Sequence, residues 1–299
     1  MLKYQLGLLG YPVEHSLSPC LHQAALRACG LEGDYRLFEV VPGVQSGAAI
    51  QHLLARVRTA EIHGLNVTIP YKQIVLPMLD EPADSARGIG AVNTIYLAQG
   101  RLVGENTDAA GFLADLKQQI TTADLHAVEN CEALVMGAGG SARAVVYALL
   151  QSSWRIHVAD RKVGQAEELV RSLRVSASDV PRLSALELSS AGLADLLANT
   201  YIGLIVNTTP LGMASNRDSS PWPGELSFPG EAFLYDLVYN PAETALMRAA
   251  RDAGLAAAGG IGMLIEQAVR SFLIWTGCTP PRQSMQQAVE SYYRERAEV

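Results

Sequence analysis

The chain has 299 residues, of which 49% are hydrophobic and 18% are charged, as in an ordinary globular protein. Its formal net charge of −7 leaves no basic excess to neutralise phosphate groups, so neither nucleic acid nor an anionic membrane is expected as the main partner. The length favours about two domains, and no apolar run approaches the roughly 18 residues of a membrane span.

The four cysteines, Cys20, Cys29, Cys131 and Cys278, are scattered without C-x-x-C spacing, which is typical of reduced thiols. The first ten residues contain too short an apolar stretch for a secretory signal. No cluster of His, Cys and carboxylate residues has the spacing of metal ligands. The sequence therefore predicts a cytoplasmic protein that binds no metal.

Short apolar runs that predict strands alternate with helical segments along the whole chain. These runs cover residues 6–9, 35–40, 62–67, 92–97, 134–136, 156–159, 204–207 and 233–238. Such alternation predicts an α/β fold with largely parallel sheets. Gln99-Gly100, between two apolar runs, predicts a hairpin turn in the first sheet. Apolar residues at helical spacing predict two further helices, over 263–275 and 282–296.

Two serines follow the first predicted strand. Pro19 is suited to the first position of a helix that Gly30 closes, and Ser18 is then the expected N-cap. Ser16 and Ser18 together place two hydroxyls beside a helix N-terminus, which suits a small anion such as a carboxylate. Simple capping is the alternative interpretation for Ser18.

A lysine and an aspartate each come soon after a predicted strand. Lys72 follows Pro70 and is expected in the first turn of a helix, where a lysine opposes the helix dipole and so indicates a function. Asp108 ends the run Gly104-Glu105-Asn106-Thr107-Asp108, where it or Thr107 is also a suitable helix N-cap. If both side chains lie at one sheet edge, they form a proton-transfer pair for a hydroxyl or carbonyl.

A glycine-rich segment follows the predicted strand 134–136. Gly137, Gly139 and Ala142 fit the G-x-G-x-x-G/A fingerprint, and Asp160 stands roughly 20 residues further on. A plain tight turn is the alternative for the glycines alone, but the strand before them and the helix after them favour a bound dinucleotide. We therefore expect residues 1–107 to form a substrate-binding catalytic domain and 108–261 a doubly wound, Rossmann-like dinucleotide-binding domain.

Eight motifs in order along the chain resemble the shikimate dehydrogenase family, and the resemblance spans nearly the whole sequence. The motifs are His15-Ser16-Leu17-Ser18-Pro19, Asn66-Val67-Thr68-Ile69-Pro70-Tyr71-Lys72, Gly90-Ala91-Val92-Asn93-Thr94, Asn106-Thr107-Asp108, Gly137-Ala138-Gly139-Gly140-Ser141-Ala142, Asn207-Thr208-Thr209-Pro210-Leu211-Gly212-Met213, Asp236-Leu237-Val238-Tyr239 and Gly262-Met263-Leu264-Ile265-Glu266-Gln267. The resemblance implies NADP-linked reduction of 3-dehydroshikimate to shikimate, a step of aromatic amino-acid biosynthesis. It also implies that helices within 262–299 return to the first domain.

The resemblance further implies roles for individual residues. Lys72 and Asp108 correspond to the catalytic pair. Residues that correspond to the substrate site are Ser16, Ser18, Asn66, Thr68, Asn93, Tyr239 and Gln267. Residues that correspond to the cofactor site are Gly137, Ala138, Gly139, Gly140, Ser141, Ala142, Asp160, Arg161, Lys162, Thr208, Met213, Leu237 and Gly260.

One segment departs from the family pattern. Asp160-Arg161-Lys162 stands where NADP-using relatives usually have Asn-Arg-Thr, and the carboxylate of Asp160 suits the free ribose hydroxyl of NAD. Arg161 and Lys162 suit the 2′-phosphate of NADP, so NADP is favoured and NAD stays open. A quinate/shikimate dehydrogenase that uses NAD is the nearest alternative, followed by a non-catalytic metabolite or dinucleotide sensor and a folate-type dehydrogenase. The protein is expected to be a monomer or a homodimer.

Overall fold

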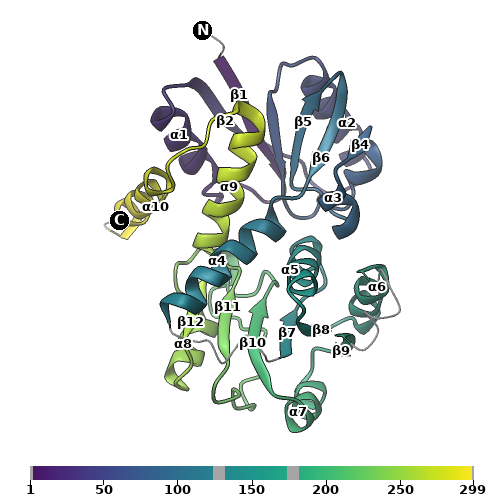
Figure 1. Ribbon diagram of the computed structural model, residues 1–299, viewed down its shortest axis with the longest axis vertical. Coiled ribbons are helices and arrows are strands. Elements are labelled where there is room, and N and C mark those ends of the chain that lie inside the picture. Colours follow the sequence, from purple (N-terminus) through teal and green to yellow (C-terminus); the bar gives the residue numbers. More distant parts are fainter. Residues whose placement is uncertain (1–2, 124–131, 174–181, 298–299) are drawn as a thin grey trace. The chain divides into compact units, whose positions relative to one another are not determined.

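The computed structural model describes residues 3–123, 132–173 and 182–297, and it divides into two compact units (Figure 1). The first unit comprises Met1–Gly111 and Ile265–Val299, and the second comprises Phe112–Leu264. The boundaries fall inside helices α4 (Asp108–Thr122) and α9 (Ile261–Thr276). Each of these two helices therefore contributes residues to both units.

The first unit contains a six-stranded sheet with the order β2-β1-β3-β5-β6-β4. Its strands are β1 (Lys3–Gly10), β2 (Glu32–Glu39), β3 (Gly64–Val67), β4 (Glu81–Pro82), β5 (Thr94–Ala98) and β6 (Arg101–Glu105). Strand β1 is parallel to β2 and β3, whereas β5 is antiparallel to both β3 and β6. The carboxyl ends of β1, β3 and β6 therefore meet the amino end of β5 at one edge of the sheet.

Helices cover this sheet on both faces. They are α1 (Ser18–Ala28), α2 (Ser46–Arg58), α3 (Asp84–Ile89), the short 3-10 helix η1 (Leu76–Met78), the later part of α9, and α10 (Arg282–Ala297). Helix α10 packs beside α1 (Figure 1). Helix α9 approaches the sheet through Trp275, whose ring occupies the space beside Gly64 and whose Nε1–H donates to the carbonyl of Ile95 at 3.2 Å. An apolar core that includes Ile50, Leu65 and Ile95 lies between α2 and the sheet.

Three local predictions can be compared with this unit. The hairpin is confirmed, since Gln99 and Gly100 have φ of 50° and 75° between antiparallel β5 and β6, as a type I′ turn requires. Ser18 is not the N-cap of α1 but its first helical residue, and its N–H donates to the Oγ of Ser16 at 3.2 Å. Lys72 does not lie in an α-helix but in a turn that leads only to η1.

The second unit contains a fully parallel sheet with the order β12-β11-β10-β7-β8-β9. Its strands are β7 (Glu132–Met136), β8 (Arg155–Asp160), β9 (Leu183–Glu187), β10 (Ile202–Asn207), β11 (Phe233–Asp236) and β12 (Ala257–Gly259). Its further helices are α5 (Gly140–Gln151), α6 (Val163–Leu173), α7 (Ser190–Asn199), α8 (Ala245–Asp252) and the short 3-10 helix η4 (Ala214–Asn216).

The order of strands in the second sheet runs outward in both directions from β7 and β10. The chain passes from β7 through β8 to β9 on one side, and from β10 through β11 to β12 on the other. This is the doubly wound arrangement of dinucleotide-binding sheets. The predicted α/β fold with largely parallel sheets and a Rossmann-like domain is confirmed.

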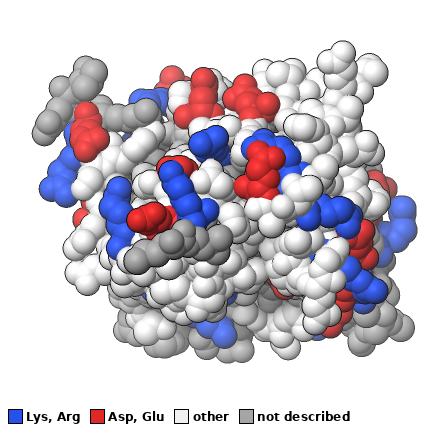
Figure 2. Space-filling model, turned by 90° about the horizontal axis from the view of Figure 1, so that it is seen from above, with Lys and Arg blue, Asp and Glu red and all other residues white. Residues whose placement is uncertain are grey.

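The described surface shows charges of both signs. On the face drawn in Figure 2, Lys and Arg side chains lie among Asp and Glu side chains. Of the helices in the described ranges, none has both the length and the apolar character needed to cross a bilayer.

Candidate active site

A buried ion pair joins the two residues that the sequence predicted to be catalytic. The ammonium group of Lys72 donates to Oδ2 of Asp108 at 2.7 Å, and the two side chains are only 11% and 6% exposed. Lys72 lies in the turn after β3, which is tied to the sheet because the N–H of Val92 donates to the carbonyl of Lys72 at 2.7 Å. Asp108 is the first residue of α4. Little solvent reaches this pair, so removing either charged group would leave the other buried without a partner, which destabilises the fold.

The amide of Asn93 connects this ion pair to its surroundings. Its Nδ2 donates to Oδ1 of Asp108 at 2.8 Å and to the Oγ1 of Thr107 at 2.9 Å, while its Oδ1 accepts the N–H of Thr107 at 2.8 Å. Asn93 is 2% exposed and directly precedes β5. Both carboxylate oxygens of Asp108 therefore have a partner, one in Lys72 and the other in Asn93, and the carboxylate is fixed in orientation.

The side chain of Asn106 holds the start of α4 in place. Thr107 occupies the N-cap position that the sequence predicted for it or Asp108, since its carbonyl accepts the N–H of Gly111 at 2.9 Å. The Oδ1 of Asn106 accepts the N–H groups of Asp108 and Ala109 at 3.1 and 3.4 Å, and its Nδ2 donates to the carbonyl of Ala91 at 2.9 Å. Asn is among the residue types that most often bond the first N–H groups of a helix, so this role of Asn106 could have been predicted from its residue type. Because the side chain of Asn106 accepts these N–H groups, the side chain of Asp108 is available to Lys72.

Asn66 lies one strand away in β3 and is bonded on both sides of its amide. Its Oδ1 accepts the hydroxyl of Tyr35 at 2.8 Å, and its Nδ2 donates to the carbonyl of Asn93 at 3.1 Å. Asn66 is 5% exposed and Tyr35 is 9% exposed. Tyr35 was predicted only as part of a strand and not as a site residue, because its contact with Asn66 joins residues 31 positions apart. Thr68 follows β3 and is half-buried next to Gly10, where an added Cβ would meet its Cγ2.

The remaining predicted substrate residues lie on three further segments. The Oγ of Ser16 donates to the Oγ of Ser18 at 3.2 Å in the segment after β1. Gln267 lies on α9, is 7% exposed, and accepts from the Nδ2 of Asn93 at 3.5 Å. Tyr239 belongs to the second unit and is half-buried.

The first unit thus gathers most of the predicted site at one sheet edge. Hydrogen bonds connect Lys72, Asp108, Asn93, Asn66 and Gln267 directly, as one network. Thr68 directly follows β3 at this edge, and the two serines lie in the segment that leads from β1 into α1.

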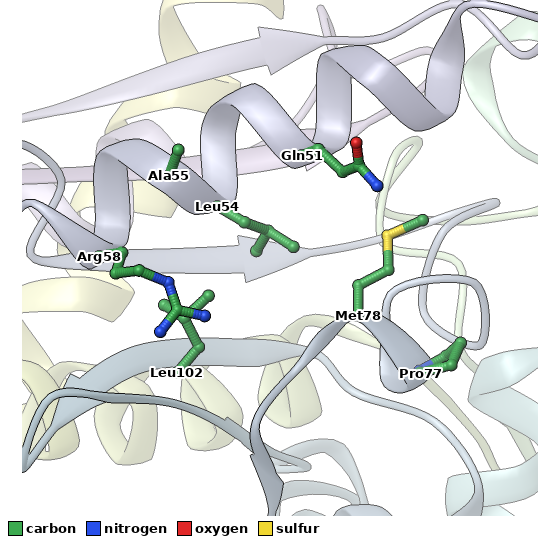
Figure 3. Close-up of a pocket in the computed structure, with 7 residues that line it drawn as sticks. All are labelled: Gln51, Leu54, Ala55, Arg58, Pro77, Met78 and Leu102. Atoms are coloured by element: carbon green, nitrogen blue, oxygen red, sulfur yellow. The ribbon is translucent and has the colours of Figure 1, made fainter.

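A separate pocket of 310 Å³ opens on the first unit between α2, η1 and β6 (Figure 3). Its floor is apolar, with Leu54, Met78 and Leu102 among its lining residues. The charged residue at its rim, Arg58, already makes an ion pair with Asp80 at 2.8 Å. None of the predicted site residues lines this pocket.

The glycine-rich loop of the second unit joins β7 to α5. Gly137 has φ of +105°, and an added Cβ would lie 2.5 Å from the Oγ1 of Thr208. Gly139, the N-cap of α5, offers no side chain to the first N–H groups of the helix, and a Cβ added there would meet nothing within 4 Å. Ala142 is fully buried, so a small residue is needed where α5 packs on the sheet. A backbone that a ligand can approach closely at a helix N-terminus fits a pyrophosphate.

Residues predicted to bind the cofactor end five neighbouring strands of the second sheet. Gly137 follows β7, Asp160 ends β8, Thr208 follows β10, Leu237 follows β11 and Gly260 follows β12. These strands are adjacent and parallel, so all five residues lie along one edge. Parallel sheets bind ligands outside the carboxyl ends of their strands, where the strand order reverses, and here it reverses between β7 and β10. Met213 lies in the turn after β10, where its N–H donates to the carbonyl of Pro210 at 3.2 Å.

The segment that departs from the family pattern has a defined local structure. Oδ1 of Asp160 accepts the backbone N–H of Lys162 at 2.9 Å, so the carboxylate stabilises its own turn. Arg161 and Lys162 are exposed, and within residues 132–173 and 182–264 neither has an ion pair in the structure. Two exposed cations beside a sheet edge that suits a dinucleotide fit an additional phosphate.

Two buried groups in the structure have strongly shifted pKa values. Burial among the rings of Tyr35, Phe272 and Trp275 lowers the pKa of His22 to about 3. In the second unit burial raises the pKa of Asp236 to about 6, although Asn207, Val238 and Thr244 donate hydrogen bonds to its carboxylate. Throughout the ranges that the structure describes, no group of three or more His, Cys, Asp or Glu side chains is arranged to hold a metal ion.

This geometry resembles that of known proteins in both units. Residues 8–95 match the family model described as "Shikimate dehydrogenase substrate binding domain", and residues 260–290 match "Shikimate 5'-dehydrogenase C-terminal domain". A protein of Salinibacter ruber named shikimate dehydrogenase (NADP(+)) is 42% identical over 287 residues, which cover 95% of this chain and 96% of that protein. The chain belongs to the shikimate dehydrogenase family.

Two solved structures are similar to this chain over nearly its full length. The Thermus thermophilus shikimate 5-dehydrogenase, crystallised with NADP(H) and shikimate, is 35% identical with a TM-score of 0.79, over 96% of this chain and 99% of that one. The quinate dehydrogenase of Corynebacterium glutamicum, crystallised with NAD, is 32% identical with a TM-score of 0.82, over 97% and 99% of the two chains. The structures similar to this chain thus include a shikimate dehydrogenase that binds NADP(H) and a quinate dehydrogenase that binds NAD.

Proposed function

We propose that this protein is an NADP-dependent shikimate dehydrogenase, which reversibly reduces 3-dehydroshikimate to shikimate in aromatic amino-acid biosynthesis. The observation that carries the proposal is the buried pair of Lys72 and Asp108, held at 2.7 Å and fixed by Asn93. Reduction of a carbonyl requires a proton for the oxygen that becomes a hydroxyl, and a buried ammonium group is a suitable donor. The names of the relatives support the same activity.

In this proposal Lys72 transfers the proton, and Asp108 orients the side chain of Lys72. Lys72 donates the proton to the substrate oxygen during reduction and accepts it during oxidation. Asp108 balances the charge of the ammonium group and keeps it in one orientation, since its other oxygen is held by Asn93. A group held in its working geometry before the substrate arrives loses no free energy to reorganisation during the reaction.

The substrate is a small ring with hydroxyl groups and one carboxylate, and the polar residues of the first unit match it in kind. We assign the carboxylate to Ser16 and Ser18, with help from Tyr239, and the ring hydroxyls to the remaining residues. Those residues are Asn66, Thr68, Asn93 and Gln267. Sites that hydrogen-bond each hydroxyl reject analogues that lack one, because a buried polar group is then left without a partner.

We assign NADP to the second unit. The residues that would hold it are the loop Gly137–Ala142, the strand-end residues Thr208, Leu237 and Gly260, and Met213. Arg161 and Lys162 would bind its additional phosphate, while Asp160 is engaged by the N–H of Lys162. When bound, NADP supplies or accepts the hydride. We further infer a cytoplasmic protein, with residues 1–107 and 262–299 as the catalytic domain and either one or two copies in the active form.

A four-way comparison of initial rates tests this function. Oxidation of shikimate and of quinate is measured by absorbance of the reduced nicotinamide, each with NADP and with NAD. The proposal predicts the highest kcat/KM for shikimate with NADP. A preference for quinate or NAD would instead favour the second candidate, a quinate/shikimate dehydrogenase, which the likeness to the Corynebacterium glutamicum enzyme supports. No turnover with any combination would favour a sensor.

A further inference from the structure

Helices α4 and α9 approach each other closely at Gly111. A Cβ added to Gly111 would lie 2.9 Å from the backbone nitrogen of Gln267, 3.1 Å from its Cβ and 3.2 Å from its Cα. Contacts of this length with a main chain cannot be relieved by a change of side-chain rotamer, so the two helices would have to separate. Both residues belong to the first unit.

The side chain of Gln267 is sensitive to such a movement, because the distance from its Oε1 to Asn93 is already at the upper limit for a hydrogen bond. The Nδ2 of Asn93 and the Oε1 of Gln267 are 3.5 Å apart, whereas the same Nδ2 lies 2.8 Å from Oδ1 of Asp108. Asp108 precedes Gly111 by one turn of α4. The approach at Gly111 thus fixes how deeply Gln267 extends toward Asn93 and Asp108.

The ion pair itself does not depend on this approach. Lys72 reaches Asp108 from the turn after β3, and Asn93 holds Asp108 from the amino end of β5. A small separation of α9 from α4 therefore changes the place of Gln267 while it leaves the proton-transfer pair intact.

We infer that Gly111 is a positioning residue that sets the depth of Gln267 and thereby the affinity for the hydroxylated ring. This inference rests on the proposed function, because the depth of Gln267 matters for affinity only if its amide binds a substrate hydroxyl. Gly111 itself touches no reacting atom.

The variant Gly111→Ala tests the inference, with Gly47→Ala as the matched control. Gly47 also lies in the first turn of a helix in the first unit, and a Cβ added there would meet nothing within 4 Å. We expect Gly111→Ala to raise the KM for shikimate about three- to tenfold, the effect of weakening one hydrogen bond, with kcat changed less than about twofold. Gly47→Ala should change neither.

A double variant distinguishes positioning from a general loss of packing. If Gly111 acts through Gln267, adding Gly111→Ala to Gln267→Ala raises KM no further. Multiplied effects, or an unchanged KM in Gly111→Ala, would overturn the inference. Wild-type protein that does not turn over shikimate would instead overturn the proposed function.

A second variant covers the case in which Gly111→Ala does not fold. Gln267→Asn withdraws the amide by one methylene and leaves the contact between α4 and α9 unchanged. It should raise the KM for shikimate about as much as Gly111→Ala is expected to, roughly three- to tenfold. A KM equal to that of the wild type would show that the depth of Gln267 does not control affinity.

Discussion

The two units hold their candidate site residues in opposite ways. In the first unit the side chains bind one another, as Lys72, Asp108 and Asn93 do at 2.7 and 2.8 Å. In the second unit the groups expected to bind the cofactor are backbone groups beside Gly137 and Gly139. The exposed side chains of Arg161 and Lys162 are expected to bind it as well. Proton transfer is thus assigned to buried side chains that hold one another in place. Phosphate binding is assigned mainly to exposed groups, those of Gly139, Arg161 and Lys162.

This difference has a consequence for substitutions. A change within the network of the first unit leaves a buried partner unsatisfied, so it should affect both rate and stability. A change of an exposed cation in the second unit removes a contact to ligand and little else. Variants in the two units should therefore separate effects on kcat from effects on cofactor affinity.

The largest effect is expected for Asp108→Asn. The amide cannot balance the charge of Lys72, so kcat for shikimate oxidation should fall by about 10²- to 10³-fold, with the KM for NADP within about twofold. Steady-state kinetics with both substrates varied measures these constants. Asp84→Asn is the matched control, because Asp84 is also the first residue of a helix but its side chain is fully exposed. Equal losses in kcat and in NADP affinity would break the distinction between the units.

A cofactor effect is expected for Arg161→Ala. Loss of one charge-assisted hydrogen bond to a phosphate should raise the KM for NADP about tenfold or more and leave the KM for NAD unchanged. The control is Arg155→Ala, an exposed arginine at the opposite end of the same strand, where it pairs with Glu132. If NAD and NADP lost affinity equally, Arg161 would not bind the phosphate that distinguishes them.

The stability of the two units should respond to pH in opposite directions. His22 has a native pKa of about 3, below its value of 6.5 in an unfolded chain. Between these values only the unfolded state binds the proton, so stability is fully present above pH 6.5 and falls as the pH is lowered, by up to about 1.4 kcal/mol per pH unit. Asp236 has a native pKa of about 6 against 3.8 unfolded, so its contribution is present below pH 3.8 and is lost as the pH rises through 6.

Native-state hydrogen exchange between pH 4 and 7, corrected for intrinsic exchange, resolves the two units separately. The variant His22→Phe should flatten the pH dependence of the first unit alone, because Phe keeps a ring against Tyr35 without a titrating group. Asp236→Asn should flatten that of the second unit alone. If either variant left the slope of its own unit unchanged, the shifted pKa would not be the source of that slope.

An effect on stability alone, without a change in catalysis at saturating substrate, is expected for Tyr35→Phe. Without the hydroxyl, Oδ1 of Asn66 loses its donor in a buried place, which should lower the free energy of unfolding by about 1–3 kcal/mol. Urea unfolding measures it. Tyr201→Phe in the second unit serves as control, since its hydroxyl bonds Glu231 on the exposed surface, and about 0.5 kcal/mol or less is expected there. Equal losses would mean that burial of the Tyr35 bond adds nothing.

Much of the fold was predictable from local pattern. All eight apolar runs became strands, and the hairpin formed at Gln99-Gly100, where Gly100 adopts positive φ without steric cost and Gln99 adopts it beside the glycine. Strands β4 and β12 were missed because two or three residues are too few to show an alternating pattern. Strand β9 was missed as well, because only one of its five residues is buried and its sequence shows no clear apolar run. Pro70 suggested a helix around Lys72, but the chain there continues only into a turn and η1.

The parts of the site that depend on the type of a single residue could be predicted from the sequence. The parts that depend on contacts between residues far apart in the sequence could not. The run Asn106-Thr107-Asp108 contains three good N-cap residues, and the sequence alone does not determine which of them caps α4. The support of Asn66 by Tyr35 and the approach of Gly111 to Gln267 join residues far apart in the chain. Those contacts exist only once the sheet and helices have packed.

The most direct test of the central claim is to measure kcat and shikimate affinity together for Lys72→Ala. The claim is that Lys72 transfers the proton and contributes little to holding the substrate. We predict a fall in kcat of at least about 10²-fold, while the dissociation constant for shikimate, measured by titration calorimetry, stays within about threefold of the wild type. A kcat close to that of the wild type would contradict the assignment of Lys72 to the proton transfer.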